Sequence, residues 1–261
     1  MPKLAQSWSA IAALVLTLPA YAELHDRGNG LLYDDVLNVT WLQNANLAET
    51  ERFGVQRIGP DGRMWYPYAL EWIAAMNENQ YLGYSNWRLP KMDPINGVAY
   101  NLLRRSDAGD TDNGYNATAP GTLYAGSTNH ELAYMYFNNL GLKSIENPDG
   151  SYNPNFGIFG NGTGDGVTAA KWTRNDVGLV KNLMAWSYWA EANFPPPNDF
   201  LAGSFGMVLG GSGPAAQSNL TYAWALRDGD VVASVPEPES ALLMLSGLGV
   251  IGALAKRRTA R

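Results

Sequence analysis

Apolar residues recur at helical spacing in two stretches of the chain. In residues 67–79 they fall at i, i+3, i+4 and i+7, the stripe that an amphipathic helix turns towards a core. The stripe consists of Ala69, Trp72, Ile73 and Met76. Pro67 suits the first turn of a helix, so the pattern predicts a helix over residues 67–79.

The second stretch covers residues 128–140. Its apolar face consists of Leu132, Met135, Tyr136 and Leu140. Thr128 followed by Glu131 has the spacing of a capping box, and Gly141 stands where helices commonly end in the left-handed conformation. A second helix is therefore predicted between these signals.

Shorter apolar runs between turn-forming residues predict β-strands. They cover residues 30–33, 39–42, 185–190, 205–209 and 222–226. Residues 34–38 and 227–230 predict turns, and the glycine- and asparagine-rich residues 147–166 predict a long surface loop. Two helices, short strands and long loops make an α+β fold.

The first 22 residues have the composition of a secretory signal peptide. Lys3 supplies a positive start, residues 10–18 are apolar, and Ala20-Tyr21-Ala22 forms an A-x-A cleavage site. Cleavage after Ala22 predicts a mature chain that begins at Glu23, and export through the Sec machinery.

The tail, residues 235–261, carries a second signal. Pro236-Glu237-Pro238 precedes an apolar run over residues 240–255, and Lys256, Arg257 and Arg258 follow. At about 1.5 Å per residue this predicted helix spans about 24 Å, short for a transmembrane helix of about 20 residues. The pattern resembles the PEP-CTERM sorting signal of Gram-negative bacteria.

That resemblance implies a route through the cell. The short helix would hold the protein in the inner membrane until an exosortase cuts the tail and the protein passes to the cell surface or extracellular matrix. A plain C-terminal anchor helix is the alternative, but it requires neither the Pro-Glu-Pro triplet nor so short a helix.

Between the two signals, residues 23–234 form the predicted domain. This part keeps 13 of the 18 basic and 22 of the 24 acidic residues, a net charge of about −9. The acidic balance argues against nucleic acid as a partner, because nucleic-acid binding needs a basic surface. The chain has no cysteine, so packing of its many Trp and Tyr side chains has to replace disulfides.

Three segments of this domain resemble the DUF1566 (Lcl C-terminal-like) domain of exported bacterial proteins. They are residues 30–42 (GLLYDDVLNVTWL), residues 83–90 (GYSNWRLP) and residues 222–231 (YAWALRDGDV). The resemblance implies a C-type-lectin-like or formylglycine-generating-enzyme-like fold, in which the two ends of the domain pair side by side.

The second and third segments contain the residues expected to hold this architecture. In Trp87-Arg88-Leu89-Pro90 the arginine is expected to bind loop carbonyl groups while its guanidinium stacks on an indole. Arg227 and Asp228 are expected to form an ion pair that closes the sheet.

Catalytic patterns are scarce. Without cysteine there is no thiol nucleophile, and His25 and His130 are the only histidines. No Gly-x-Ser-x-Gly, HExxH, Walker or dinucleotide-binding pattern occurs in the sequence. A non-catalytic module is therefore expected. An Asp/Glu pair that hydrolyses envelope polysaccharide remains the alternative.

Two other groups of residues are candidates for binding. Asp107, Asp110, Asp112 and Asn113 offer oxygen ligands of the kind that Ca²⁺ prefers, although a loop whose side chains bind its own backbone is the favoured interpretation. A second, weaker oxygen-rich loop covers residues 161–166. The Glu-Pro-Asn and Gln-Pro-Asp triplets of calcium-dependent lectins are absent from the sequence.

The second group is aromatic. Trp186, Tyr188 and Trp189 lie on a predicted strand, which places the first two on one face and the third on the other. One set is expected in the core, and the other could stack on sugar rings if it is exposed. Core packing of both sets is the favoured expectation. The sequence thus predicts an exported, surface-sorted binding or structural module, with exopolysaccharide as a candidate partner.

Overall fold

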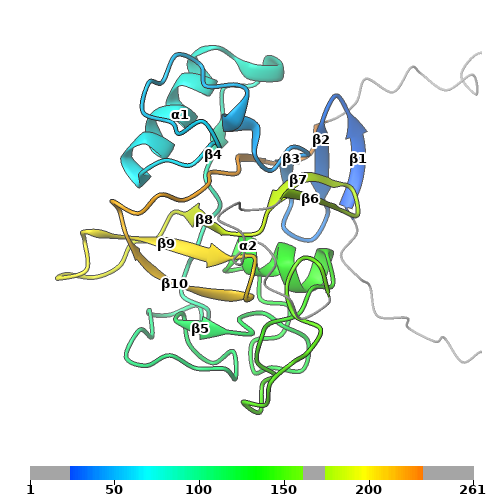
Figure 1. Cartoon of the computed structure of the whole chain (residues 1–261), viewed down its shortest axis with the longest axis vertical. Helices are drawn as coiled ribbons and strands as arrows, with labels where there is room; N and C mark the ends of the chain where they lie inside the picture. Colours follow the sequence, from blue (N-terminus) through cyan, green and yellow to red (C-terminus); the bar gives the residue numbers. More distant parts are fainter. Residues whose placement is uncertain (1–23, 161–173, 232–261) are drawn as a thin grey trace, which may run out of the picture.

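Antiparallel sheets and two helical segments make up the regular structure of the domain (Figure 1). The computed structural model describes residues 24–160 and 174–231. The predicted signal peptide with Ala20 and Ala22, the loop at residues 161–166 and the sorting tail with its predicted helix lie outside these ranges. In the ranges described, no helix has the length and apolar character needed to cross a membrane.

The described residues form three sheets. The five-stranded sheet contains, in spatial order, β1 (Leu24–Gly28), β2 (Leu31–Asp34), β3 (Val39–Leu42), β11 (Leu226–Asp228) and β4 (Trp87–Arg88). The four-stranded sheet contains β5 (Gly114–Tyr115), β10 (Gly211–Ala216), β9 (Leu201–Gly206) and β8 (Ser187–Ala190). A hairpin of β6 (Arg174–Val177) and β7 (Val180–Met184) forms the third.

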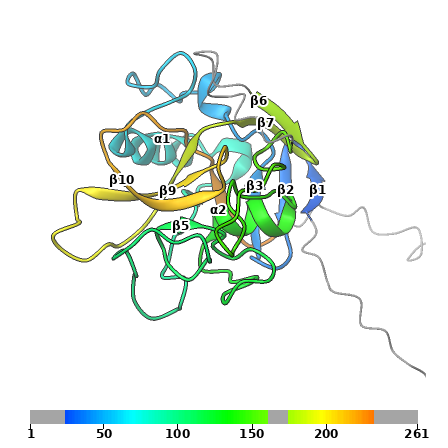
Figure 2. The ribbon, with the colours of Figure 1, turned by 60° about the horizontal axis from the view of Figure 1, so that its bottom comes forward.

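The helical elements are short apart from one. They are α1 (Tyr66–Glu78), α2 (Glu131–Tyr134), the π-helical turn η3 (Met135–Asn139) that continues α2, and the 3₁₀ turns η1 (Leu47–Glu49) and η2 (Tyr81–Gly83). The four-stranded sheet lies between α1 and α2 (Figures 1 and 2). The architecture is therefore a mixture of helix and mainly antiparallel sheet.

The first predicted helix is confirmed. α1 starts one residue before the predicted range and ends one residue before its end, with a proline in its first turn. Its buried residues are Ala69, Trp72, Ile73 and Met76, the predicted stripe. The periodicity was decisive here because α1 packs on the core through a single face.

The second helix is confirmed at its position, but its predicted capping box is wrong. His130, not Thr128, precedes the first helical residue, and no side chain caps that end. The Glu131 carboxylate instead accepts a hydrogen bond from the Lys91 amide (2.6 Å) and two from Arg88. A buried ion pair has replaced the local cap.

The predicted strands are partly correct. β2 and β3 with the turn between them are confirmed, and the Asp34 carboxylate accepts hydrogen bonds from the amides of Val36 (3.1 Å) and Leu37 (2.9 Å) in that turn. β9 ends at Gly206, so residues 207–209 form a turn and not a strand. β11 contains Arg227 and Asp228, which the sequence placed in a turn.

The three segments that resemble DUF1566 lie together in the five-stranded sheet. β11 pairs with β3 on one side, with Leu226 opposite Trp41, and with β4 on the other, with Leu226 opposite Arg88. Trp41 and Trp224 bring their rings to 4.7 Å, and the Trp224 indole N–H donates to the Leu42 carbonyl oxygen (2.7 Å). The expected side-by-side pairing of the two ends of the domain is thus confirmed.

An ion-pair network centred on Arg88 joins this sheet to α2. The guanidinium donates two hydrogen bonds to Glu131 (both 2.7 Å) and two to Asp228 (2.6 and 2.9 Å). A fifth hydrogen bond goes to the carbonyl oxygen of Leu89 (3.0 Å). Burial opposes the charge on Arg88, but its hydrogen bonds to the two carboxylates and their negative charges outweigh this, and the pKa of Arg88 is raised. The network is held on rigid elements at both ends.

This network corrects the expected partners. Asp228 pairs with Arg88, whereas Arg227 lies over the Tyr84 ring (4.3 Å to its centroid) and donates to the Asn86 side chain (3.0 Å). In β11 consecutive side chains point to opposite faces, so Arg227 and Asp228 cannot meet each other. The Arg88 guanidinium binds two carboxylates and one carbonyl group. Its main partners are therefore carboxylates and not the loop carbonyl groups that the sequence predicted.

We expect Arg88→Met to lower the free energy of unfolding by about 3 kcal/mol, because it leaves the Glu131 carboxylate buried without its partner. The side chains of Arg88 and Glu131 are only 15% and 8% exposed. Asp228→Asn is the matched control: its side chain is 67% exposed, so its loss should cost less than about 1 kcal/mol. Urea unfolding of the two variants measures the difference, and equal losses would contradict a dominant Arg88–Glu131 pair.

Candidate functional site

Of the three predicted aromatic binding residues, the structure leaves one at the surface. Tyr188 and Trp189 are fully buried, and their polar atoms bind backbone groups of Met184 (2.8 Å) and Met64 (3.0 Å). Tyr188 and Trp189 are therefore core residues, not ligand-binding residues. Both sheet faces are covered at this point, so alternation along the strand could not expose either of them.

Trp186, just before β8, is partly exposed and lines a groove on the four-stranded sheet. This sheet-face groove consists of two adjoining cavities of about 530 and 360 Å³ that share Trp186, Ser187 and Ser204. The larger is also lined by Arg105 and Tyr115, and the smaller by Arg63.

Small residues of neighbouring strands form the floor of the groove. Ser187 lies opposite Gly206, Gly206 opposite Gly211, and Gly211 opposite Tyr115. Opposite residues share a sheet face, so these side chains leave a trough beside the Tyr115 ring. A Cβ on Gly211 would lie 3.0 Å from that ring, so a larger residue there would press against Tyr115. The bulky Phe205 points to the other face, against Tyr136 (5.2 Å between ring centroids).

The walls of the groove are held in place. The Trp186 indole N–H donates to the Leu220 carbonyl oxygen (3.1 Å). Arg105 lies over the Tyr115 ring (4.3 Å to its centroid) and donates to the Tyr115 hydroxyl group. Burial raises the pKa of Tyr115 although the charge of Arg105 lowers it. The groove thus offers aromatic surface, hydroxyl groups and a guanidinium on a rigid sheet.

Acidic side chains are missing from this lining. Among the described residues that border the two cavities, none is Asp or Glu. Acid–base catalysis of glycoside hydrolysis needs two carboxyl groups beside the bound sugar. The described lining of the groove does not offer such a pair.

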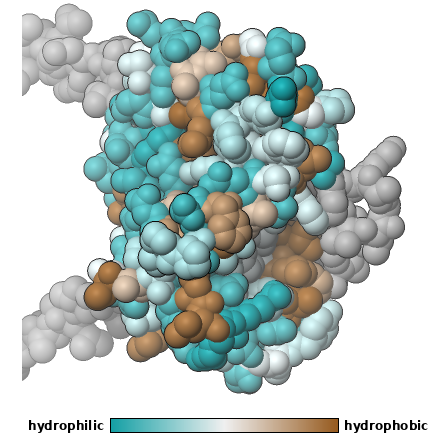
Figure 3. Space-filling view, turned by 90° about the vertical axis from the view of Figure 1, so that its left-hand side faces the viewer, coloured by the Kyte–Doolittle hydropathy of each residue, from teal (hydrophilic) through white to brown (hydrophobic). Residues whose placement is uncertain are grey.

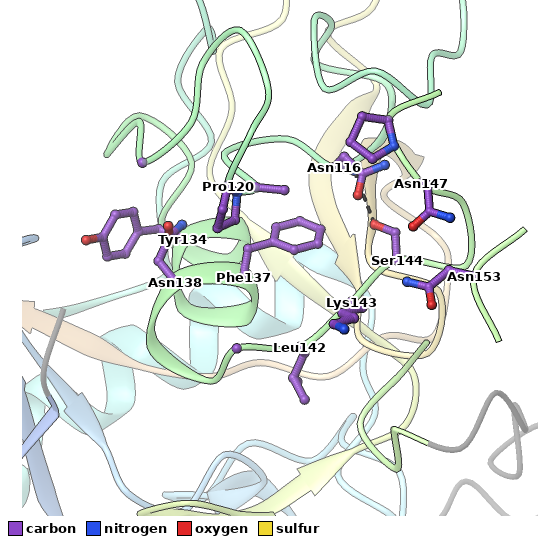
Figure 4. Close-up of a pocket in the computed structure, with 14 residues that line it drawn as sticks. Asn116, Pro120, Tyr134, Phe137, Asn138, Leu142, Lys143, Ser144, Asn147 and Asn153 are labelled. Atoms are coloured by element: carbon purple, nitrogen blue, oxygen red, sulfur yellow. Dashed lines mark hydrogen bonds between the residues drawn. The ribbon is translucent and has the colours of Figure 1, made fainter. Parts of the chain in front are cut away.

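A second cavity of about 670 Å³ lies beside η3, and Figure 4 shows the side chains that surround it. Phe137 of η3 points towards Asn116 and Ser144 of the loops, whereas Asn138 lies beside Tyr134 and donates to Thr118 (3.2 Å to its hydroxyl group). The Asn116 side-chain amide donates to the carbonyl oxygens of Asp107 (2.6 Å) and Glu146 (2.8 Å). Because such amide groups tie the loops to each other, we interpret this cavity as part of the framework.

A smaller cleft of about 390 Å³ beside α1 holds acidic residues. Asp93, Glu191 and Lys91 line it together with Tyr66. Burial raises the pKa of Glu191, and the charges of Arg88 and Lys91 oppose that rise. Of the cavities described here, this cleft alone has two carboxylates in its lining, a feature that sequence spacing did not reveal.

The predicted calcium loop is used by the fold. The Asp112 carboxylate accepts hydrogen bonds from the amides of Ile95 and Asn101 (both 2.7 Å), and Asp110 pairs with Arg104 (2.9 Å). Asp107 contributes its carbonyl oxygen to Asn116, while Asn113 borders the sheet-face groove. Within the ranges described, no three His, Asp or Glu side chains gather to hold a metal ion. Calcium binding at this loop stays a prediction of the sequence.

The two histidines occupy different environments. His25 belongs to β1 and contacts Asp35 (3.3 Å). His130 is fully buried, and neither of its ring nitrogens has a hydrogen-bond partner. Burial lowers the pKa of His130 to about 3, which keeps its ring neutral at physiological pH.

Comparison with protein families matches residues 234–258 to the PEP-CTERM protein-sorting motif. The match includes the predicted processing residues Pro236, Glu237 and Pro238. It implies an exported protein that is anchored in the membrane before an exosortase processes it, and that then lies on the cell surface. No curated protein and no solved structure matches the chain.

We expect the buried His130 to make stability depend on pH. Below its ordinary pKa of about 6.5 the unfolded chain binds a proton that the folded protein cannot bind until pH falls to about 3. The free energy of unfolding should therefore fall as pH drops through this window, by up to about 1.4 kcal/mol per pH unit from this residue. In urea unfolding between pH 7.5 and 5, His130→Leu should remove that part of the slope.

His25→Leu provides the control for this measurement, since it removes the other histidine from a partly exposed strand. It should keep the steep loss of stability towards low pH. If His130→Leu and the unmodified protein show the same slope, protonation of His130 is not what destabilises the fold.

Proposed function

We propose that this protein is a non-catalytic glycan-binding module, which its sorting tail brings to the cell surface or the extracellular matrix. Exopolysaccharide is the proposed partner there. The observation that carries this proposal is the sheet-face groove with Trp186 in its wall.

The groove suits a sugar chain in shape and chemistry. The indole of Trp186 offers a flat apolar surface for the C–H face of a sugar ring, and the hydroxyl groups of Ser187 and Ser204 border the same cavities. On the face shown in Figure 3, apolar residues lie in small groups among hydrophilic ones. Such a surface favours a polar ligand over a protein partner with a large apolar interface.

We further propose that the domain belongs with the DUF1566 family and has its lectin-like fold. Support comes from the meeting of the three similar segments in one sheet, and from the pairing of β3 with β11 across most of the domain. Because fold does not fix activity, the proposed binding rests on the groove and not on this kinship.

The alternative is hydrolysis of envelope polysaccharide. The cleft beside α1 favours it, because Asp93 and Glu191 line one cavity and burial raises the pKa of Glu191. A carboxyl group with a raised pKa is what a general acid requires. The cleft lacks the aromatic groove that holds a polymer, so binding is the function that we put first.

We expect Trp186→Ala to weaken glycan binding at least tenfold, which corresponds to about 1.4 kcal/mol of lost stacking. The measurement is a glycan-array screen with the full chain, with and without calcium, followed by titration of the best ligand. Trp65→Ala is the matched control, because Trp65 is 43% exposed and lies outside the groove lining; it should bind normally.

The same samples separate binding from hydrolysis. If the unmodified protein produces new reducing ends and the Glu191→Gln variant does not, the protein is a hydrolase and the non-catalytic proposal is wrong. No glycan bound under either condition, or equal binding by Trp186→Ala and the unmodified protein, would contradict the proposed function.

A substitution on the groove floor tests the location independently. A Cβ on Gly206 would make only ordinary contacts, 3.6 Å from the Gly211 carbonyl oxygen and 3.7 Å from the Ser187 hydroxyl. We therefore expect Gly206→Ala to fold and bind normally, and Gly206→Leu to fold but bind at least tenfold more weakly, because its side chain fills the trough. Thermal unfolding and glycan titration of both variants check this, and full binding by Gly206→Leu would place the ligand elsewhere.

A further inference from the structure

We propose that the ligand of the sheet-face groove is an anionic glycan, and that Arg105 binds a sugar carboxylate at one end of the groove. This inference rests on the proposed function and adds the chemical class of the ligand.

The charge of the groove is opposite to that of the domain around it. Residues 23–234 carry a net charge of about −9. The described lining of the groove contains Arg105 and Arg63 and no acidic residue. One guanidinium in the lining of each cavity, with no other charge in the described lining, complements a polymer that bears negative groups.

Arg105 is the cation that is available to a ligand. Its guanidinium is held over Tyr115 and donates to that hydroxyl group. Within the described part of the chain, no carboxylate lies within ion-pair distance of Arg105, whereas its neighbour Arg104 pairs with Asp110 (2.9 Å). Glu146 acts on Tyr115 through its charge but forms no ion pair with Arg105 there. A guanidinium has five N–H donors, so most of them remain for a ligand.

Arg63 is engaged differently. Its guanidinium makes a 2.7 Å ion pair with Asp61. Its charge is therefore largely balanced within the protein, and Arg105 carries the selectivity.

A carboxylate fits the geometry of such a site. Arginine binds carboxylates through two parallel hydrogen bonds, which are stronger than hydrogen bonds between neutral groups. Stacking on Tyr115 pre-orders the guanidinium, so less side-chain entropy is lost when the ligand binds. A uronic acid residue presents a carboxylate at the edge of its ring, where it can meet Arg105 while another ring of the chain covers Trp186.

The test uses the full chain and pairs of probes that differ in charge. Oligogalacturonate and its methyl ester have the same sugar rings, and dextran sulfate and dextran give the corresponding pair for sulfate. We expect the unmodified protein to bind oligogalacturonate at least tenfold more tightly than the methyl ester at low salt. The difference should shrink as ionic strength rises.

Arg105→Gln should remove this preference and keep the weaker binding of the methyl ester. Arg104→Gln is the matched control: it removes an exposed arginine of the same segment and should keep the preference. Thermal unfolding of both variants should match that of the unmodified protein.

Each contrary outcome has a separate meaning. Equal binding of acid and ester, or equal losses in Arg104→Gln and Arg105→Gln, overturns the inference while the glycan-binding function stands. Binding of dextran sulfate without oligogalacturonate also overturns it, because the carboxylate would then be the wrong anion. Failure of every probe, together with no glycan bound on the array, removes the proposed function itself.

Discussion

The arrangement of the domain depends on the ion pairs of the guanidinium of Arg88, whose side chain is only partly exposed. It joins β4, β11 and the start of α2 through Glu131 and Asp228. These elements come from distant parts of the chain, so each carboxylate closes a long loop. A buried charge is tolerated only with well-placed partners. The ion pairs therefore set the position of α2 against the sheet, while apolar packing supplies most of the stabilisation.

Buried tryptophan side chains stabilise this cysteine-free domain, a role that disulfides have in many other exported domains. Trp41, Trp72, Trp189 and Trp224 are fully buried. The indole N–H groups of Trp72 and Trp189 donate to carbonyl oxygens of Glu51 (2.9 Å) and Met64 (3.0 Å). The four rings bury large apolar areas, and the indole N–H groups of Trp72 and Trp189 also hold two residues that lie outside the helices and strands. Long loops can thus stay ordered without cysteine.

The groove is a product of the same packing. Large aromatic residues fill the face of the four-stranded sheet towards α2, and small residues occupy the part of the opposite face that no helix covers. Trp186 and Arg105 then border a surface whose floor is formed by hydrogen-bonded strands. A binding site built on strands needs little ordering when a ligand arrives. Asp93 and Glu191 line the separate cleft beside α1, whereas the described lining of the groove contains no carboxylate.

Local patterns in the sequence determined the features that depend on neighbouring residues alone. These are the buried stripe of α1, the β2–β3 turn, the signal peptide pattern and the sorting tail. β9 and β10 were missed or misplaced because glycine, serine and alanine give no hydrophobic alternation. Long-range contacts decided the rest. Glu131 binds Arg88 and does not form the predicted capping box, and Asp228 pairs with Arg88 on the neighbouring strand. Tyr188 and Trp189 are buried by elements that lie far away in the sequence. The groove likewise exists only because β5, β8, β9 and β10 meet, and sequence spacing carries no record of that meeting.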